Sequence, residues 1–61
     1  MSKDRARRTI MNWIGCRFDE AMMILDGVWP VRGDNYSAKI VDEDYVEIYR
    51  DGLLIHRIFV F

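Results

Sequence analysis

The fold is decided by residues 45–60, which read YVEIYRDGLLIHRIFV. Two runs rich in β-branched and aromatic residues flank Asp51-Gly52, a strong signal for a two-residue turn whose central positions both need positive φ. We therefore predict strands at 45–50 and 53–60, and the turn length sets their register. The expected pairs are Ile48 with Ile55, Glu47 with His56, and Val46 with Arg57.

A third strand is predicted at 36–41, joined to the next by the loop 42–44. A three-residue loop places Ile40 opposite Val46 and so unites the apolar positions, whereas a two-residue loop would turn the strand to the other face. The same register puts Ala38 opposite Ile48 and Lys39 beside Glu47. The face that a helix would cover then carries Tyr36, Ala38, Ile40, Val46, Ile48, Leu53, Ile55 and Phe59. The opposite face carries Tyr45, Tyr49, Leu54, Ile58 and Val60 around a polar row.

Residues 3–26 are predicted to form one helix, because good helix formers dominate, no proline interrupts them and Gly27 stands where a left-handed C-terminal cap belongs. Its core stripe consists of Ile10, Met11, Ile14, Phe18, Ala21, Met22 and Leu25. Outside the stripe lie Trp13, Cys16, Met23 and Ile24, mixed with Arg17 and Glu20. A helix that is apolar around most of its circumference is usually buried around most of it.

The connector 28–35 contains Pro30, which lacks a backbone donor, so at most a short edge strand fits there. The predicted fold is α+β, a single domain over 1–61 with one long N-terminal helix packed across a three-stranded antiparallel β-meander. A helix of about 36 Å outreaches strands of about 20–27 Å, so two or more helical turns should overhang the sheet. The edge of the last strand is open to pairing unless the connector covers it.

The apolar content of the chain exceeds what so small a core can hold. Of 61 residues, 51% are hydrophobic, and a domain of this size buries only about 60% of its unfolded surface. Cys16 is the only cysteine, so no disulfide compensates. We expect a second copy or a protein partner to cover the surplus, with large aromatic side chains as anchors. The predicted contact residues are Trp13, Arg17, Glu20, Met23, Ile24, Tyr45, Tyr49, Leu54, Ile58 and Val60.

The expected function is that of a small non-enzymatic protein-binding module, either a homodimer or an accessory or inhibitory protein docking on a larger protein target. From size alone, phages and other mobile elements are an expected source of such a chain. The alternative is a nucleic-acid-binding regulator, because residues 1–17 hold five basic groups and one acid, and residues 18–61 four basic groups and nine acids. The basic positions are Lys3, Arg5, Arg7, Arg8 and Arg17.

No catalytic, cofactor or metal motif is found. Cys16 and His56 have no positional relationship that would pair a nucleophile with a base, so an enzyme with a small-molecule substrate is not expected. One cysteine and one histidine do not complete a zinc site, and the acidic stretch 42–44 lacks the glycine of a calcium loop. The lone cysteine and the charged N-terminal segment predict a cytoplasmic protein, and no apolar run approaches the length of a membrane span.

Overall fold

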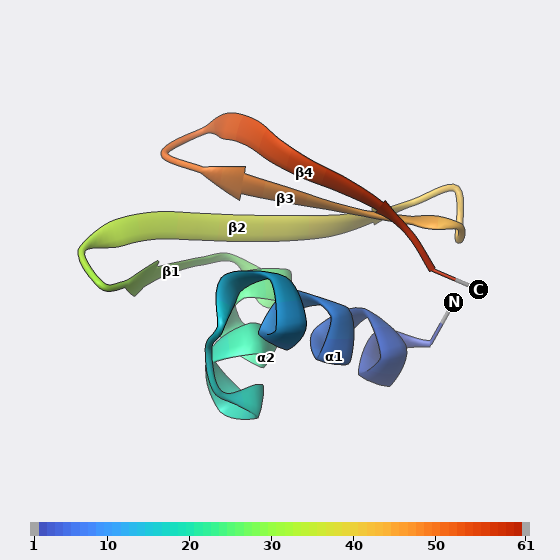
Figure 1. The fold of residues 1–61 in the computed structure, drawn as a ribbon, viewed down its shortest axis with the longest axis horizontal. Helices are drawn as coiled ribbons and strands as arrows, with labels where there is room; N and C mark the ends of the chain where they lie inside the picture. Colours follow the sequence, from blue (N-terminus) through green and yellow to red (C-terminus); the bar gives the residue numbers. More distant parts are fainter. Residues whose placement is uncertain (1, 61) are drawn as a thin grey trace.

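Two helices, rather than one, precede a four-stranded antiparallel sheet in the computed structural model, which describes residues 2–60 (Figure 1). The elements are α1 (Lys3–Ile14), α2 (Phe18–Asp26), β1 (Val28–Val31), β2 (Asp34–Val41), β3 (Tyr45–Arg50) and β4 (Leu53–Phe59). The strands lie in the order β1-β2-β3-β4, so β1 and β4 are the edges. The α+β class is confirmed. The prediction of one long helix over three strands is wrong.

The predicted helix is interrupted at Gly15. This residue adopts the left-handed conformation (φ 76°, ψ 34°), and its N–H donates to the Met11 carbonyl, which caps the end of α1. Helix α2 restarts after Arg17, whose backbone N–H donates to Oε1 of Glu20 at 2.9 Å. The chain thus folds back and places α2 beside α1. Because each helix is short, the predicted overhang of a helix beyond the sheet is also wrong.

Gly15→Ala should lower the free energy of unfolding by about 1–2 kcal/mol, the cost of holding an L-residue in the left-handed region. The nearest atom to an added Cβ would be Nη2 of Arg32 at 3.8 Å, so the loss is conformational rather than steric. Gly27 was predicted to be a left-handed cap, which is wrong, since its φ of −177° is extended. Gly27→Ala is therefore the matched control and should change the free energy of unfolding by less than about 0.5 kcal/mol. Urea unfolding followed by circular dichroism measures the free energy of unfolding of both variants. Equal losses would contradict the assignment of Gly15 as the left-handed cap of α1.

Both predicted hairpin turns are present. Asp51 and Gly52 have φ values of 52° and 82°, as a two-residue hairpin turn requires. The three-residue loop 42–44 is confirmed by the pairs Ile40 with Val46, Ala38 with Ile48, and Lys39 with Glu47. The connector supplies β1, a four-residue edge strand that pairs with β2 and not with β4.

The register that the Asp51-Gly52 turn sets holds only next to the turn, because a β-bulge follows in the last strand. Next to the turn, Leu54 pairs with Tyr49, but His56 then pairs with Ile48, which leaves Ile55 as the extra residue. Beyond the bulge every partner differs by one from the predicted register. Ile48, Glu47 and Val46 pair with His56, Arg57 and Ile58.

The bulge also exchanges the two faces of β4, because side chains alternate along a strand and one extra residue reverses the alternation. Ile58 and Val60, predicted for the outer face, are partly buried and pack against the core. Phe59, predicted for the helix-facing side, packs its ring against Tyr45 instead, with centroids 4.3 Å apart. The predicted placement of all three residues is therefore wrong.

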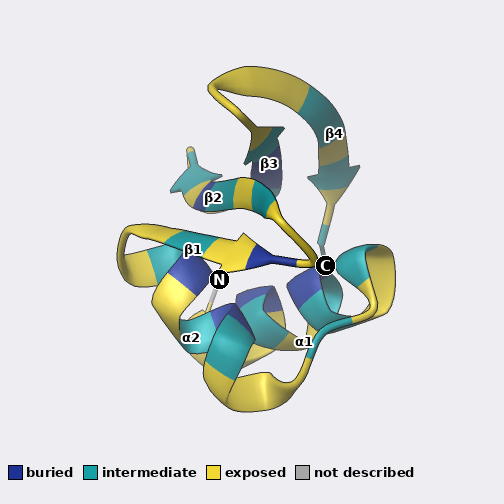
Figure 2. Ribbon diagram, turned by 90° about the vertical axis from the view of Figure 1, so that its left-hand side faces the viewer, coloured by how far each residue is buried: buried dark blue, intermediate teal, exposed yellow. Residues whose placement is uncertain are grey.

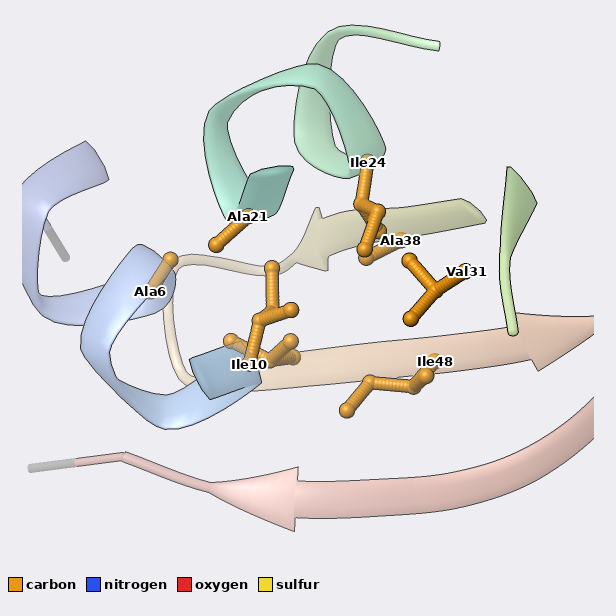
Figure 3. Packing of buried hydrophobic residues seen from close by; sticks show 8 residues of the cluster. Ala6, Ile10, Ala21, Ile24, Val31, Ala38 and Ile48 are labelled. Atoms are coloured by element: carbon orange, nitrogen blue, oxygen red, sulfur yellow. The ribbon is translucent and has the colours of Figure 1, made fainter. Parts of the chain in front are cut away.

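The core is small and wholly aliphatic (Figure 3). Ile24, predicted to lie outside the core stripe, is 0% exposed and points toward the sheet, whereas Phe18 of the predicted stripe is exposed. The break at Gly15 explains why Ile24 and Phe18 change places. Because α2 is a separate helix, its rotation about its own axis is independent of α1, and the stripe predicted for one continuous helix does not extend into it. The eight buried hydrophobic residues are Ala6, Ile10, Ala21, Ile24, Val31, Ala38, Val46 and Ile48.

Both helices lie on one side of the sheet, and β4 is the strand farthest from them (Figure 2). Leu53, at the start of β4, shares a row with Arg50 and is 72% exposed, although it was predicted to be covered. The sheet extends beyond the helices, and not the helices beyond the sheet (Figure 1).

Neither described helix has the length and apolar character needed to cross a membrane.

Candidate protein-interaction surface

The side of the sheet that faces away from the helices carries an ordered set of aromatic and charged side chains. Side chains that pair across strands point to the same face, so the pairings assign this face directly. We call it the outer sheet face. On β2, β3 and β4 it consists of Ser37, Lys39, Val41, Tyr45, Glu47, Tyr49, Leu54, Arg57 and Phe59.

Glu47 is the centre of the outer sheet face and is only 7% exposed. Its Oε1 accepts a hydrogen bond from the Tyr49 hydroxyl at 3.0 Å and lies 3.8 Å from Nζ of Lys39. Its Oε2 lies 3.4 Å from Nε of Arg57. A buried carboxylate needs such partners, because an unpaired one would be strongly destabilising. The three groups come from β2, β3 and β4 and join the strands across this face.

The two cations of this face also stack on aromatic rings. The Arg57 guanidinium lies 5.0 Å from the ring centroid of Tyr45, and Nζ of Lys39 lies 5.5 Å from that of Tyr49. Tyr45 in turn contacts Phe59. Each long side chain is thus held from two directions, which restricts its rotamers before any partner arrives.

Of the predicted contact residues on the sheet, Tyr45, Tyr49 and Leu54 lie together on this face, whereas Ile58 and Val60 do not. The predicted contact residues did not include Lys39 and Glu47, whose pairing was expected only as a polar row. They also lacked Phe59 and Arg57, because both follow the bulge. The extra residue gives little local signal, since Leu53, Leu54 and Ile55 form an unbroken apolar run in which alternation cannot be followed.

The predicted contact residues on the helices lie on the other side of the sheet. Trp13 is 53% exposed and its ring contacts His56 of β4, with centroids 4.7 Å apart. Met23 is exposed on α2. Arg17 pairs with Asp19 at the start of α2, where Glu20 serves as a cap. The structure therefore does not unite the helix and sheet residues into one surface.

The basic segment is partly engaged within the chain. Arg7 pairs with Asp4 at 3.2 Å and lies 5.7 Å from the ring of Phe18. Lys3 lies 4.0 Å from Asp26. Arg5 and Arg8 make no ion pair with any carboxylate of the described residues. No observation on this segment favours phosphate binding over these intramolecular contacts.

Cys16 lies in the link between the helices and not within a helix. Partial burial, reinforced by the negative charge of Glu20, raises the pKa of its thiol. Because the thiolate is the reactive form, alkylation by iodoacetamide at pH 8 should be slower in the folded protein than in urea. The pH at half-maximal rate should lie higher in the folded chain. Equal midpoints in the two states would contradict this assignment.

Among residues 2–60, no group of three or more histidine, cysteine, aspartate or glutamate side chains is arranged to hold a metal ion. The surface that these residues form has no pocket. No protein-family model, curated protein or solved structure matches the chain.

Proposed function

We propose that this chain is a small non-enzymatic protein-interaction module that binds a protein partner or a second copy through the outer sheet face. The observation that supports the proposal is where the aromatic residues lie. None of the seven aromatic residues in the described part of the chain is buried, and Tyr45, Tyr49 and Phe59 share one face that no helix covers.

The composition of this face suits protein recognition. Aromatic residues and arginine are enriched at protein interfaces, and a few of them supply most of the binding energy. Phe59 and Leu54 are 54% and 49% exposed, so each has apolar area left to bury. The charged row of Glu47 and Arg57 lies between these two side chains, so exposed apolar groups alternate with charged ones across the face.

The contacts among the side chains of the outer sheet face reduce the conformational entropy that is lost on binding. Arg57 and Lys39 are already held by Glu47 and by tyrosine rings, so less rotamer entropy remains to be lost when a partner covers them. Glu47 already has three partners, so its burial under another protein leaves no unpaired carboxylate. An accessory or inhibitory role on a larger target is compatible with this mode of binding.

A photo-crosslinking amino acid tests the proposal. Placed at Leu54 in the full chain inside its native cell, it should yield covalent adducts, either with another protein or with a second copy. Met23 on α2 is the matched control position, because it has the same exposed fraction of 49% but lies on the other side of the sheet. Phe59→Ser should abolish the adducts from position 54. Adducts from position 23 alone would contradict the proposal.

A further inference from the structure

The dipeptide Asp-Gly occurs twice in the chain, at 26–27 and at 51–52. In such a pair the backbone nitrogen of the glycine can attack the carboxyl carbon of the aspartate, because the glycine has no side chain to block the approach. A carbon–nitrogen bond forms, and the amide proton and the carboxyl hydroxyl leave together as water. Addition of water to either carbonyl of the resulting cyclic imide then gives aspartate or isoaspartate. The reaction needs no other reactant.

At Asp51 the carboxylate is held within the sheet. Its Oδ1 accepts a hydrogen bond from the Asn35 N–H at 3.3 Å, and the Asp51 N–H donates to the Asn35 carbonyl at 2.8 Å. These bonds extend the pairing of β2 with β3 by one residue into the hairpin turn. Ring closure requires the carboxyl group to rotate toward the following peptide bond, so the bond to the Asn35 N–H must first break.

Asp26 is the last residue of α2, and this end of the helix lacks the cap that closes α1. The Gly15 N–H donates to the Met11 carbonyl at 2.8 Å, whereas Gly27, with φ −177° and ψ −138°, has no such bond to its helix. A carboxylate at this end also meets the negative pole of the helix dipole, and no basic residue lies in the last turn of α2. Uncapped helix ends open locally at low cost. We therefore expect the last turn of α2 to open more readily than the end of α1.

The Asp26 carboxylate is also weakly held. Its Oδ1 lies 4.0 Å from Nζ of Lys3, and the two side chains are 59% and 67% exposed. Such an exposed pair contributes about 1 kcal/mol at most. Among residues 2–60 no group donates a hydrogen bond to this carboxylate. The carboxyl group of Asp26 is therefore freer to rotate toward the following peptide bond than that of Asp51.

We infer that Asp26 is a site of spontaneous isomerisation to isoaspartate in the folded protein, and that the fold protects Asp51. In the product the backbone passes through the side-chain carbon of residue 26, so the link between α2 and β1 gains one methylene group. The free carboxylate moves to the α-carbon and the net charge is unchanged. The product is a substrate for the class of carboxyl methyltransferases that recognise isoaspartate. This inference is independent of the outer sheet face.

Ageing of the purified full chain at neutral pH tests the inference. Trypsin separates the two sites, since cleavage after arginine places them on the peptides 18–32 and 51–57. Electron-transfer fragmentation then locates isoaspartate in each peptide. In the folded chain it should accumulate about tenfold faster at Asp26 than at Asp51, which corresponds to a difference of about 1.4 kcal/mol in local opening. In urea the two rates should become similar, because both sites are then open. Equal rates in the folded chain, or a preference for Asp26 that persists in urea, would overturn the inference.

A change of charge at the end of α2 tests the cause. Met23→Lys places a cation in the last turn of α2, at a position that is half exposed. It should slow isomerisation of Asp26 about threefold, because it stabilises this end of the helix, and leave Asp51 unaffected. Met23→Gln is the matched control, since it is polar but uncharged, and should keep the native rate. Equal rates at Asp26 in both variants would overturn the assignment of the open helix end as the cause.

Discussion

Ile24→Ala is expected to lower the free energy of unfolding by about 3 kcal/mol, the largest effect of any single truncation considered for this chain. The side chain is fully buried between α2 and the sheet (Figure 3). Its removal loses the transfer free energy of the deleted carbons and leaves a cavity in a core of eight residues. Small domains are stable by only about 5 kcal/mol, so the variant should be close to unfolding at ambient temperature.

Met23→Ala is the matched control for this prediction. Met23 precedes Ile24 in the same helix but is half exposed, so its truncation should cost less than about 1 kcal/mol. Urea titrations followed by circular dichroism give both values at a shared m-value. If Met23→Ala were the more damaging change, the rotation of α2 described above would be wrong, and Ile24 would belong to the surface that the sequence predicted for it.

Ile58→Ala should cost about 2 kcal/mol, and Phe59→Ala less than half of that. The bulge at Ile55 turns Ile58 toward Val46 and the helices, and Phe59 toward Tyr45 on the outer sheet face. The two residues are adjacent and both are large and apolar, so the comparison isolates the direction in which each side chain points.

Binding should respond in the opposite sense. Phe59→Ala should weaken the association of the outer sheet face, whereas Ile58→Ala should leave it unchanged in the folded fraction. Thermal unfolding measures the loss of stability in each variant, and sedimentation measures the association of the same two samples. If Phe59→Ala lost more stability than Ile58→Ala, the hairpin would have the regular register without the bulge. Phe59 would then face the core and not the interaction surface.

The hairpin turns were predictable because their signals are local. Asp51-Gly52 supplies a residue pair that tolerates positive φ, and the match of Ile40 with Val46 selects a three-residue loop without reference to the rest of the fold. The contact of Lys39 with Glu47 follows from the same register. Three residues of the candidate site, Tyr45, Tyr49 and Leu54, were therefore placed correctly.

The helix break was less accessible, because a glycine inside a helical pattern is tolerated at a cost of about 1 kcal/mol. Gly15 acts as a cap because the chain gains contacts by folding back, which brings Ala6 of α1 and Ala21 of α2 together in the core. A continuous helix would lose those contacts. The signal in the sequence was Glu20, three residues after Arg17, the position from which a side chain caps a new helix.

The sequence by itself determined the α+β class, the strands of the last two hairpins and the excess of apolar side chains over core. Each of these depends on composition or on contacts between near neighbours. The tertiary structure decided where the helix breaks and that β4 carries a bulge. It thereby decided which of Ile58 and Phe59 faces outward. The reason is that one extra residue in a strand costs little locally, and the choice is made by packing against α1 and the sheet, far away in the sequence.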